Sequence, residues 1–125
     1  MNEKPNILIV DDEMLIGMAL ADDLMALGYA ISGPFATTAD ADASCKIDKP
    51  DMAFLDVNLG KDRTSHDFAR KLLKKKVPVV FLTGYSELFA ANAEFDDIPV
   101  LSKPVELEKV IRSIKYHLEG TNSSD

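Results

Sequence analysis

Five short apolar segments, spread along the chain and separated by stretches of helical length, constrain the fold of this sequence more than any other feature. They are rich in β-branched and aromatic residues and cover Asn6–Val10, Tyr29–Ser32, Met52–Leu55, Val77–Leu82 and Ile98–Leu101. Apolar residues follow one another in these segments with little polar alternation, which is typical of parallel strands that are buried on both faces. The alternation of such strands with helical stretches predicts an α/β protein.

The stretches between these strands carry helical patterns of unequal strength. The strongest begins just past Pro104 and ends at Gly120, and its apolar residues recur at spacings that place them on one face. That face consists of Leu107, Val110, Ile111, Ile114 and Leu118. We expect further helices over Glu13–Leu27, Thr37–Ile47, Ser65–Lys75 and Ser86–Ala93, of which the last has the weakest pattern. Five strand–helix units predict a flavodoxin-like, doubly wound (βα)5 domain, with a five-stranded parallel sheet in the order 2-1-3-4-5 and helices on both faces.

The same patterns predict which side chains lie inside the protein. The expected interior residues are Leu15, Met18, Leu24 and Leu27 with Met14 and Met25 in the first helix, Phe68, Leu72 and Leu73 in the third, and Phe81 and Phe95 elsewhere. The single Cys45 has no partner for an internal disulfide and is expected to be a small buried side chain. The expected surface residues are His66 and His117 on helices and Lys74, Lys75 and Lys76 at a helix end.

Length and charge exclude several classes of protein. The chain has 125 residues, with 14 Lys and Arg against 21 Asp and Glu, and a formal net charge of −7. This length predicts one domain, residues 1–120, followed by a polar tail, residues 121–125, and we expect the domain to act alone. The acidic balance argues against a direct nucleic acid partner. Apolar runs fall far short of the roughly 20 residues that span a bilayer, and the N-terminus lacks a signal peptide pattern, so we expect a cytoplasmic protein without a membrane partner.

Polar residues directly follow four of the predicted strands. Asp11, Asp12 and Glu13 follow the first, Asp56 the third, Thr83 and Gly84 the fourth, and Ser102, Lys103 and Pro104 the fifth. The carboxyl ends of parallel strands meet at one edge of the sheet, where such folds bind ligands. Clustered aspartates repel one another, and a hard cation such as Mg²⁺ relieves that repulsion through oxygen ligands. With Lys103 and Thr83 nearby, this edge fits a phosphoryl group, and Asp56 is placed to attack phosphorus.

This combination of residues resembles the receiver domain of bacterial two-component response regulators. The matching residues are Asp11-Asp12, Asp56, Thr83 and Lys103-Pro104, and the resemblance covers essentially Asn6 to Leu118. It implies that Asp56 accepts a phosphoryl group, in a Mg²⁺-dependent reaction, from a phosphohistidine of a sensor histidine kinase or a histidine phosphotransfer protein. It implies a signalling protein and not an enzyme in the ordinary sense. A conformational change of this protein would act on a downstream protein. A homodimer that forms on phosphorylation is a further expectation.

The resemblance also implies the metal ligands. In this family the second acidic residue, here Asp12, binds Mg²⁺ directly, and the first, Asp11, acts mostly through water. The phosphoacceptor Asp56 and the backbone carbonyl of Asn58, two residues later, complete the set of metal ligands.

Two further residues are implied to contact the phosphoryl group. Thr83 corresponds to a hydroxyl that moves toward a phosphoryl oxygen, and Lys103 pairs with the phosphoryl group. The Lys103–Pro104 bond is expected to be cis. The family resemblance also implies Mg²⁺-dependent self-phosphorylation from small phosphodonors, and self-hydrolysis of the aspartyl phosphate that resets the signal.

Three features depart from the common receiver pattern. The loop after Asp56, residues 57–67, reads VNLGKDRTSHD and lacks the usual proline and later glycine. Val100 stands where many receivers carry a Tyr or Phe switch residue. The segment Phe81–Tyr85 resembles a subgroup, frequent in alphaproteobacteria, in which Gly and Tyr follow the switch Thr. We therefore hypothesise that Tyr85, or movement of the fourth helix, carries the output.

Other readings of the sequence fit less well. A haloacid-dehalogenase-like phosphatase needs a second aspartate as general acid, and Asn58 occupies that position. A flavodoxin needs a phosphate cradle after the first strand, where the acidic residues that begin with Asp11 would repel flavin phosphate. The remaining alternative is a receiver-like interaction module that works without phosphorylation.

Overall fold

The chain folds around one parallel sheet. The structure is a computed structural model that describes residues 4–60, 64–84 and 93–119. The strands are β1 (Asn6–Val10), β2 (Ala30–Phe35), β3 (Met52–Asp56), β4 (Val79–Thr83) and β5 (Val100–Ser102). They pair in parallel in the order β2-β1-β3-β4-β5. This order confirms the predicted flavodoxin-like, doubly wound sheet.

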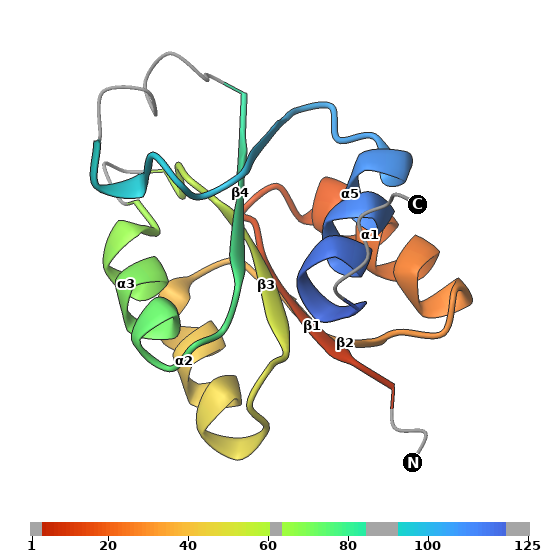
Figure 1. Ribbon diagram of the computed structural model, residues 1–125, viewed down its shortest axis with the longest axis horizontal. Helices are drawn as coiled ribbons and strands as arrows, with labels where there is room; N and C mark the ends of the chain where they lie inside the picture. The colour runs from red at the N-terminus through yellow and green to blue at the C-terminus, as the bar shows by residue number, and fades with distance from the viewer. Residues whose placement is uncertain (1–3, 61–63, 85–92, 120–125) are drawn as a thin grey trace.

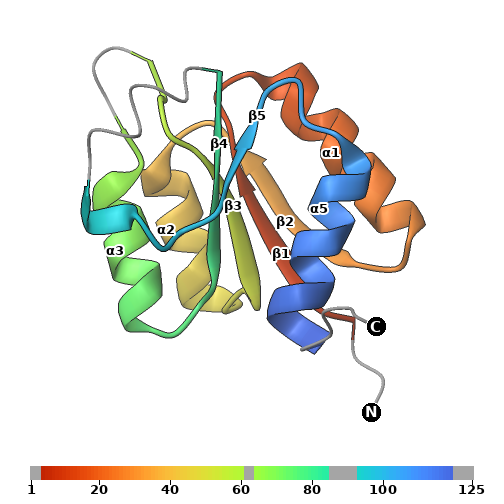
Figure 2. The same ribbon diagram turned by 45° about the horizontal axis from the view of Figure 1, so that its top comes forward.

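Helices cover both faces of the sheet, as Figures 1 and 2 show. One face carries α1 (Met14–Ala26) and α5 (Leu107–Ile114), which continues into the π-helical turn η2 (Lys115–Glu119). The other face carries α2 (Thr38–Ile47), α3 (His66–Lys74) and the short 3-10 helix η1 (Ala93–Phe95). Most of the predicted helix over residues 86–93 lies outside the described residues, and so does Tyr85, the hypothesised output residue. Ala93, the expected last residue of that helix, begins η1.

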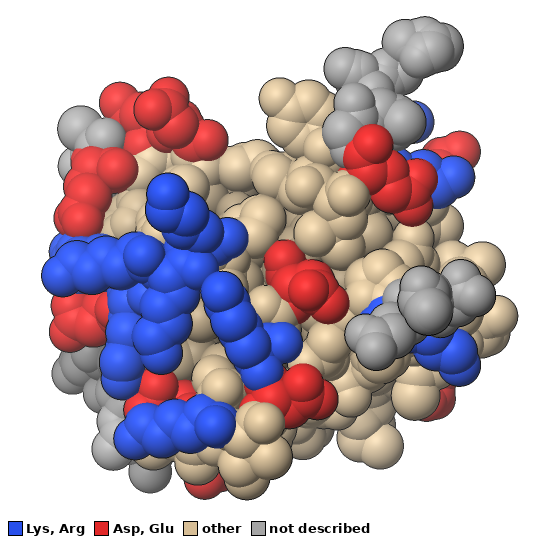
Figure 3. Space-filling view, turned by 60° about the horizontal axis from the view of Figure 1, so that its bottom comes forward, with Lys and Arg blue, Asp and Glu red and all other residues tan. Residues whose placement is uncertain are grey.

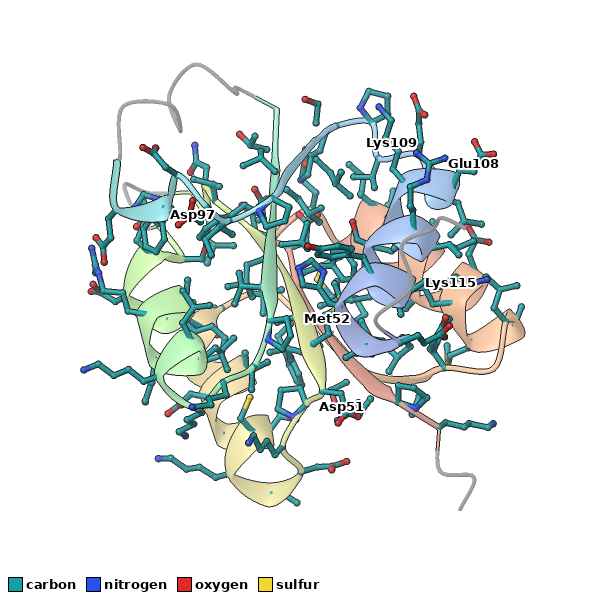
Figure 4. The ribbon with its side chains drawn as sticks, in the orientation of Figure 1. Asp51, Met52, Asp97, Glu108, Lys109 and Lys115 are labelled. Carbon is teal, nitrogen blue, oxygen red and sulfur yellow. The ribbon has the colours of Figure 1, made fainter. Side chains whose placement is uncertain are left out.

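Alternate residues of each central strand belong to two different cores. In β1, Ile7 and Ile9 pack with α1 and α5, whereas Leu8 and Val10 pack with α2 and α3. Met52 of β3, labelled in Figure 4, belongs to the α5 side with Ile114. All residues of β1, β3 and β4 are buried, which explains why their sequences lack polar alternation.

The predicted inner face of α1 is wrong. Its buried residues are Gly17, Leu20, Ala21 and Leu24, so of the expected set Leu24 alone lies inside. The rest of that set is substantially exposed: Met14 39%, Leu15 84%, Met18 50%, Met25 50% and Leu27 53%. A Cβ atom on Gly17 would lie 2.7 Å from Cβ of Pro34 in β2. The buried face therefore combines the small residues Gly17 and Ala21 with Leu20 and Leu24, and the other large apolar residues of the expected set face outward.

Three more interior and surface predictions need correction. Cys45 is half-buried against the α2 and α3 core, and burial raises the pKa of its thiol. His66 is half-buried, with its ring centroid 5.9 Å from that of Phe81 and 5.1 Å from that of Phe95. Burial lowers the pKa of His66. His117 is also half-buried, and its Nδ1 lies 2.9 Å from the backbone oxygen of Ser113.

Several other side chains lie where the sequence predicted. Phe68, Leu72, Phe81 and Phe95 are buried in the α2 and α3 core, and Leu73 packs against that core. The inward face of the last helix is confirmed for Leu107, Val110, Ile114 and Leu118, which belong to the opposite core. Ile111 is half-buried.

Lysines gather at the end of the molecule where α2 and α3 terminate. Lys46, Lys49, Lys74, Lys75 and Lys76 are exposed there, which confirms the solvated face expected for the last three. Figure 3 shows Lys and Arg side chains concentrated on this side of the surface. Within the described residues, every helix is too short or too polar to cross a bilayer.

Candidate phosphoacceptor site

The topology brings four strand ends to one edge of the sheet. β1 and β3 are neighbours, but the chain leaves β1 toward α1 on one face and leaves β3 toward α3 on the other. This is the point at which open α/β sheets bind ligands. A pocket of about 580 Å³ lies here. Its lining residues are Asp12, Glu13, Ile16, Asp56, Asn58, Gly60, Thr83, Gly84, Lys103 and Pro104.

Three aspartates converge at this edge, as the strand order predicts. Asp11 follows β1 and is 0% exposed, Asp56 ends β3 and is 4% exposed, and Asp12 is exposed. One carboxylate oxygen from each lies within 4.8 Å of the others. Local hydrogen bonds orient the two buried carboxylates, because Glu13 N donates to Asp11 Oδ1 at 2.9 Å and Asn58 N donates to Asp56 Oδ1 at 3.2 Å.

Lys103 supplies the positive charge of the site. It follows β5, and the Lys103–Pro104 bond is cis, as expected. Its Nζ lies 3.0 Å from Asp11 Oδ2 and 3.1 Å from Asp56 Oδ2, and it also donates to Oε1 of Glu13. Its side chain is 11% exposed. Burial would lower the pKa of Lys103, but its hydrogen bonds to Glu13, Asp11 and Asp56 outweigh burial and raise it, so the ammonium stays charged.

The environment of Asp56 works against its ionisation. Burial raises the pKa of Asp56 first of all, and the neighbouring Asp11 raises it further. The hydrogen bond from Lys103 lowers it but compensates incompletely, so that the pKa of Asp56 is about 7. One lysine thus faces more negative charge than it can neutralise. An additional cation at this edge would relieve the imbalance.

The residues present fit a hard divalent cation. The three converging carboxylates offer oxygen ligands, of which Mg²⁺ needs one or two from protein side chains. Asn58 and Gly60 line the same pocket from the loop after β3, and Gly60 N donates to Asn58 Oδ1 at 2.9 Å. Gly60 has φ +80°, and a Cβ atom there would lie 3.1 Å from Asp12 Oδ2. Glycine thus lets this loop turn closely beside Asp12.

Every predicted site residue lies at this edge. Asp12, Asp56, Asn58, Thr83 and Lys103 line the pocket, and the buried Asp11 contacts Lys103 beneath them. Thr83 is itself 4% exposed.

The contact between Glu13 and Lys103 was not predicted from the sequence. The acidic run that ends in Glu13 was the available signal, but its spacing does not reveal which carboxylates reach a lysine 90 residues away. The place of Gly60 beside Asp12 was not predicted either. Val100, the departure from the aromatic switch, pairs in register with Phe81 and packs against the α3 side of the core.

Similar sequences point to the same family of proteins. A family model described as the response regulator receiver domain matches residues 7–115. The chain is 34% identical over 121 residues to the sensory transduction protein LytT of Bacillus subtilis. This match covers 89% of this chain and 47% of LytT. It is also 30% identical over 114 residues to the phyllosphere-induced regulator PhyR of Methylorubrum extorquens. That match covers 90% of this chain and 43% of PhyR. The chain thus spans about half the length of the curated relatives it matches.

Solved structures agree with these sequence matches. The receiver (REC) domain of the PhyR response regulator from Erythrobacter litoralis superposes with a TM-score of 0.83 at 30% identity, over 98% of this chain and 95% of that chain. SdrG from Sphingomonas melonis Fr1 gives a TM-score of 0.79 at 37% identity, over 94% of this chain and 99% of that chain. The fold, the converging strand ends and the family match lead to one conclusion: this chain belongs to the response regulator receiver domain family.

Proposed function

We propose that this receiver domain is a phosphoacceptor and that Asp56 accepts the phosphoryl group. One observation carries the proposal: Nζ of Lys103 lies 3.1 Å from Oδ2 of the buried Asp56, at the edge where Asp11 and Asp12 converge. A nucleophilic carboxylate with a fixed cation beside it has the arrangement that phosphoryl transfer requires, because this reaction depends on positioning and charge neutralisation.

The transfer proceeds as an in-line displacement at phosphorus. A carboxylate oxygen of Asp56 forms the new O–P bond, while the N–P bond of a phosphohistidine breaks and the imidazole leaves with the bonding electron pair and takes up a proton. Lys103 binds one oxygen of the transferred group, and the hydroxyl of Thr83 binds another. Attack of water on phosphorus later breaks the O–P bond, which releases inorganic phosphate and restores the carboxylate.

We propose that Mg²⁺ assists this step. Asp12 and Asp56 would hold the ion directly, Asp11 mostly through water, and the backbone carbonyl of Asn58 would complete the protein ligands. The ion supplies positive charge that offsets the oxygens of the transferred group. The raised pKa of Asp56 supports this role, because burial and the neighbouring Asp11 both disfavour its ionised form, which a bound cation would stabilise.

We propose a sensor histidine kinase or a histidine phosphotransfer protein as the phosphodonor, in the cytoplasm. The exposed apolar side chains of α1 support this assignment: Met14, Leu15 and Met18 lie on the helix that also contributes Ile16 to the pocket. A donor protein that covers this surface would bring its phosphohistidine to Asp56. The downstream target is a further protein, and phosphorylation would favour a homodimer. The unit that carries these functions is residues 1–120, with 121–125 as a tail.

The proposal is tested by incubation with Mg²⁺ and acetyl phosphate, followed by intact-mass measurement. In this reaction the Asp56–P bond forms as the acetyl phosphate O–P bond breaks and acetate leaves. The wild type should gain the mass of one phosphoryl group, and Asp56→Asn should gain none. Asp23→Asn, which changes an exposed aspartate of α1, should behave as the wild type. A chain that gains no adduct, or an equal adduct in Asp56→Asn, would refute the proposal and favour an interaction module that works without phosphorylation.

A further inference from the structure

Lys103 makes one contact that lies outside the phosphoacceptor chemistry described above. Besides Asp11 and Asp56, its ammonium donates to Oε1 of Glu13. Glu13 precedes the first residue of α1, but its side chain makes no capping hydrogen bond to that helix. Its side chain is 57% exposed and lines the pocket. The orientation of this carboxylate toward Lys103 is therefore not a by-product of helix capping.

The hydrogen-bond capacity of Lys103 is fully used. An ammonium group has three hydrogens, and three carboxylates accept from Nζ of Lys103. A phosphoryl oxygen can gain a hydrogen bond from Lys103 when one of these contacts opens. Asp11 is 0% exposed and cannot turn to solvent, whereas Glu13 stands at the rim and can be hydrated. The contact with Glu13 is the one that can open at low cost.

We infer that Glu13 is a positioning residue that holds Lys103 at the rim of the pocket and competes with the incoming phosphoryl group for it. This inference rests on the proposed function of Asp56. It predicts that Glu13 slows phosphorylation of the domain, because the contact must open before Lys103 can bind the transferred group. The carboxylate also adds a negative charge to the lining of a pocket that must admit an anion.

Glu13 also has an effect that would speed phosphorylation, because it helps to order Lys103, but this effect is weaker than the competition. A contact that restrains a flexible lysine spares part of the entropy cost of ordering that side chain when it binds the phosphoryl group. However, Asp11 already restrains Lys103, since Nζ lies 3.0 Å from Oδ2 of Asp11 and the lysine side chain is 11% exposed. Removal of Glu13 therefore loses little preorganisation, and the competition and the charge repulsion dominate.

The contact itself is tested without metal or phosphodonor. In Glu13→Gln, the Lys103 ammonium hydrogens should exchange with water at least about two-fold faster in 15N-resolved NMR, because an ionic hydrogen bond is replaced by a weaker neutral one. Glu108→Gln is the matched control: Glu108 projects from α5, as Figure 4 shows, and should leave the exchange unchanged. Equal exchange rates in the wild type and Glu13→Gln would overturn the inference.

The consequence is tested by phosphorylation with acetyl phosphate and Mg²⁺, followed by intact mass. At low ionic strength Glu13→Gln should be phosphorylated about two- to five-fold faster than the wild type, the range that partly exposed ion pairs support. Glu13→Asp keeps the charge and should return toward the wild-type rate. The difference should shrink in about 1 M salt, because screening weakens charge effects but leaves a packing defect unchanged.

The two proposals fail in different ways. If the wild type gains no phosphoryl group, the proposed function is wrong, whereas the exchange measurement still decides whether Glu13 holds Lys103. If the wild type is phosphorylated and Glu13→Gln reacts at the same rate or more slowly, the competition by Glu13 is refuted and the proposed function stands. A rate increase that is the same at low and high salt would also refute it.

Discussion

Nζ of Lys103 lies 3.1 Å from Oδ2 of Asp56, and this ion pair connects the last residue of β3 to the residue that follows β5. This ion pair does not return the pKa of Asp56 to its ordinary value. Burial and the neighbouring Asp11 outweigh the lysine and raise the pKa of Asp56 to about 7. Ionisation of Asp56 is therefore disfavoured in the folded protein, and this has a measurable effect on stability.

Asp56 should make the metal-free protein less stable as the pH rises from about 4 to about 8. Its pKa is about 7 in the folded state against an ordinary value of 3.8, so the folded state binds this proton more tightly than the unfolded state does. The stability that the proton contributes is fully present below pH 3.8 and is lost as the pH rises through 7. A single proton limits the slope to about 1.4 kcal/mol per pH unit. Urea unfolding with a metal chelator across this pH range measures the effect.

Asp56→Asn isolates this titration from those of the other carboxylates. The amide cannot ionise, so the free energy of unfolding of this variant should exceed that of the wild type by an amount that grows with pH. Asp23→Asn, at an exposed position, should run parallel to the wild type. A difference between Asp56→Asn and the wild type that is constant over the range would contradict the assignment.

Gly17→Ala should destabilise the protein although alanine favours helices. At an exposed helical position the change from Gly to Ala stabilises by about 1 kcal/mol. At Gly17 the new Cβ would lie 2.7 Å from Cβ and 3.1 Å from Cγ of Pro34, and overpacking of this kind costs about 1–3 kcal/mol. We expect a lower free energy of unfolding in urea. Ala19→Gly, at an exposed position of α1, should lose about 1 kcal/mol by propensity alone. A more stable Gly17→Ala would show that Pro34 can move aside.

The same position explains why the sequence did not reveal the inner face of α1. Apolar periodicity assumes that large apolar side chains point inward, and it predicted the strands, α3 and α5 correctly because their cores are filled by such residues. In α1 the rule holds for Leu20 and Leu24, but the close approach at Gly17 places this glycine and Ala21 on the same buried face, and Leu15 and Met18 face outward. Small residues carry little hydrophobic signal, so this contact could not be predicted without the position of Pro34.

The candidate site was more predictable than α1. Parallel strands bring their carboxyl ends together whatever their packing details, so the convergence of Asp11, Asp56 and Lys103 followed from the strand order alone. The environment of His66 could not be predicted in this way, because its contacts with Phe81 and Phe95 join residues that are distant in sequence. A histidine at the start of a helix carries no local signal of such an environment.

Phe95→Ala should be far more destabilising than Arg70→Ala. Phe95 is 1% exposed, and its ring centroid lies 5.2 Å from that of Phe81, so its truncation leaves a cavity and should cost about 3–5 kcal/mol. Arg70 contacts the same ring from outside, 5.6 Å from its centroid, and pairs with Glu94, but it is exposed to screening water. Chemical denaturation of both variants measures the two costs. Equal costs would mean that the ion pair of Arg70 holds η1 against α3 as firmly as the buried ring does.

Leu15→Glu should separate the two ways in which the domain can acquire a phosphoryl group. Leu15 is 84% exposed, so a charged residue there should leave the free energy of unfolding and the reaction with acetyl phosphate close to the wild type. Transfer from a phosphorylated histidine kinase or phosphotransfer protein should slow at least about ten-fold, because burial of a glutamate in an apolar interface costs more than about 1.4 kcal/mol. Ile47→Glu is the matched control: Ile47 is 89% exposed at the far end of α2, and transfer should be unaffected. If Leu15→Glu and Ile47→Glu accept the phosphoryl group from the protein donor equally fast, the exposed face of α1 is not the donor surface.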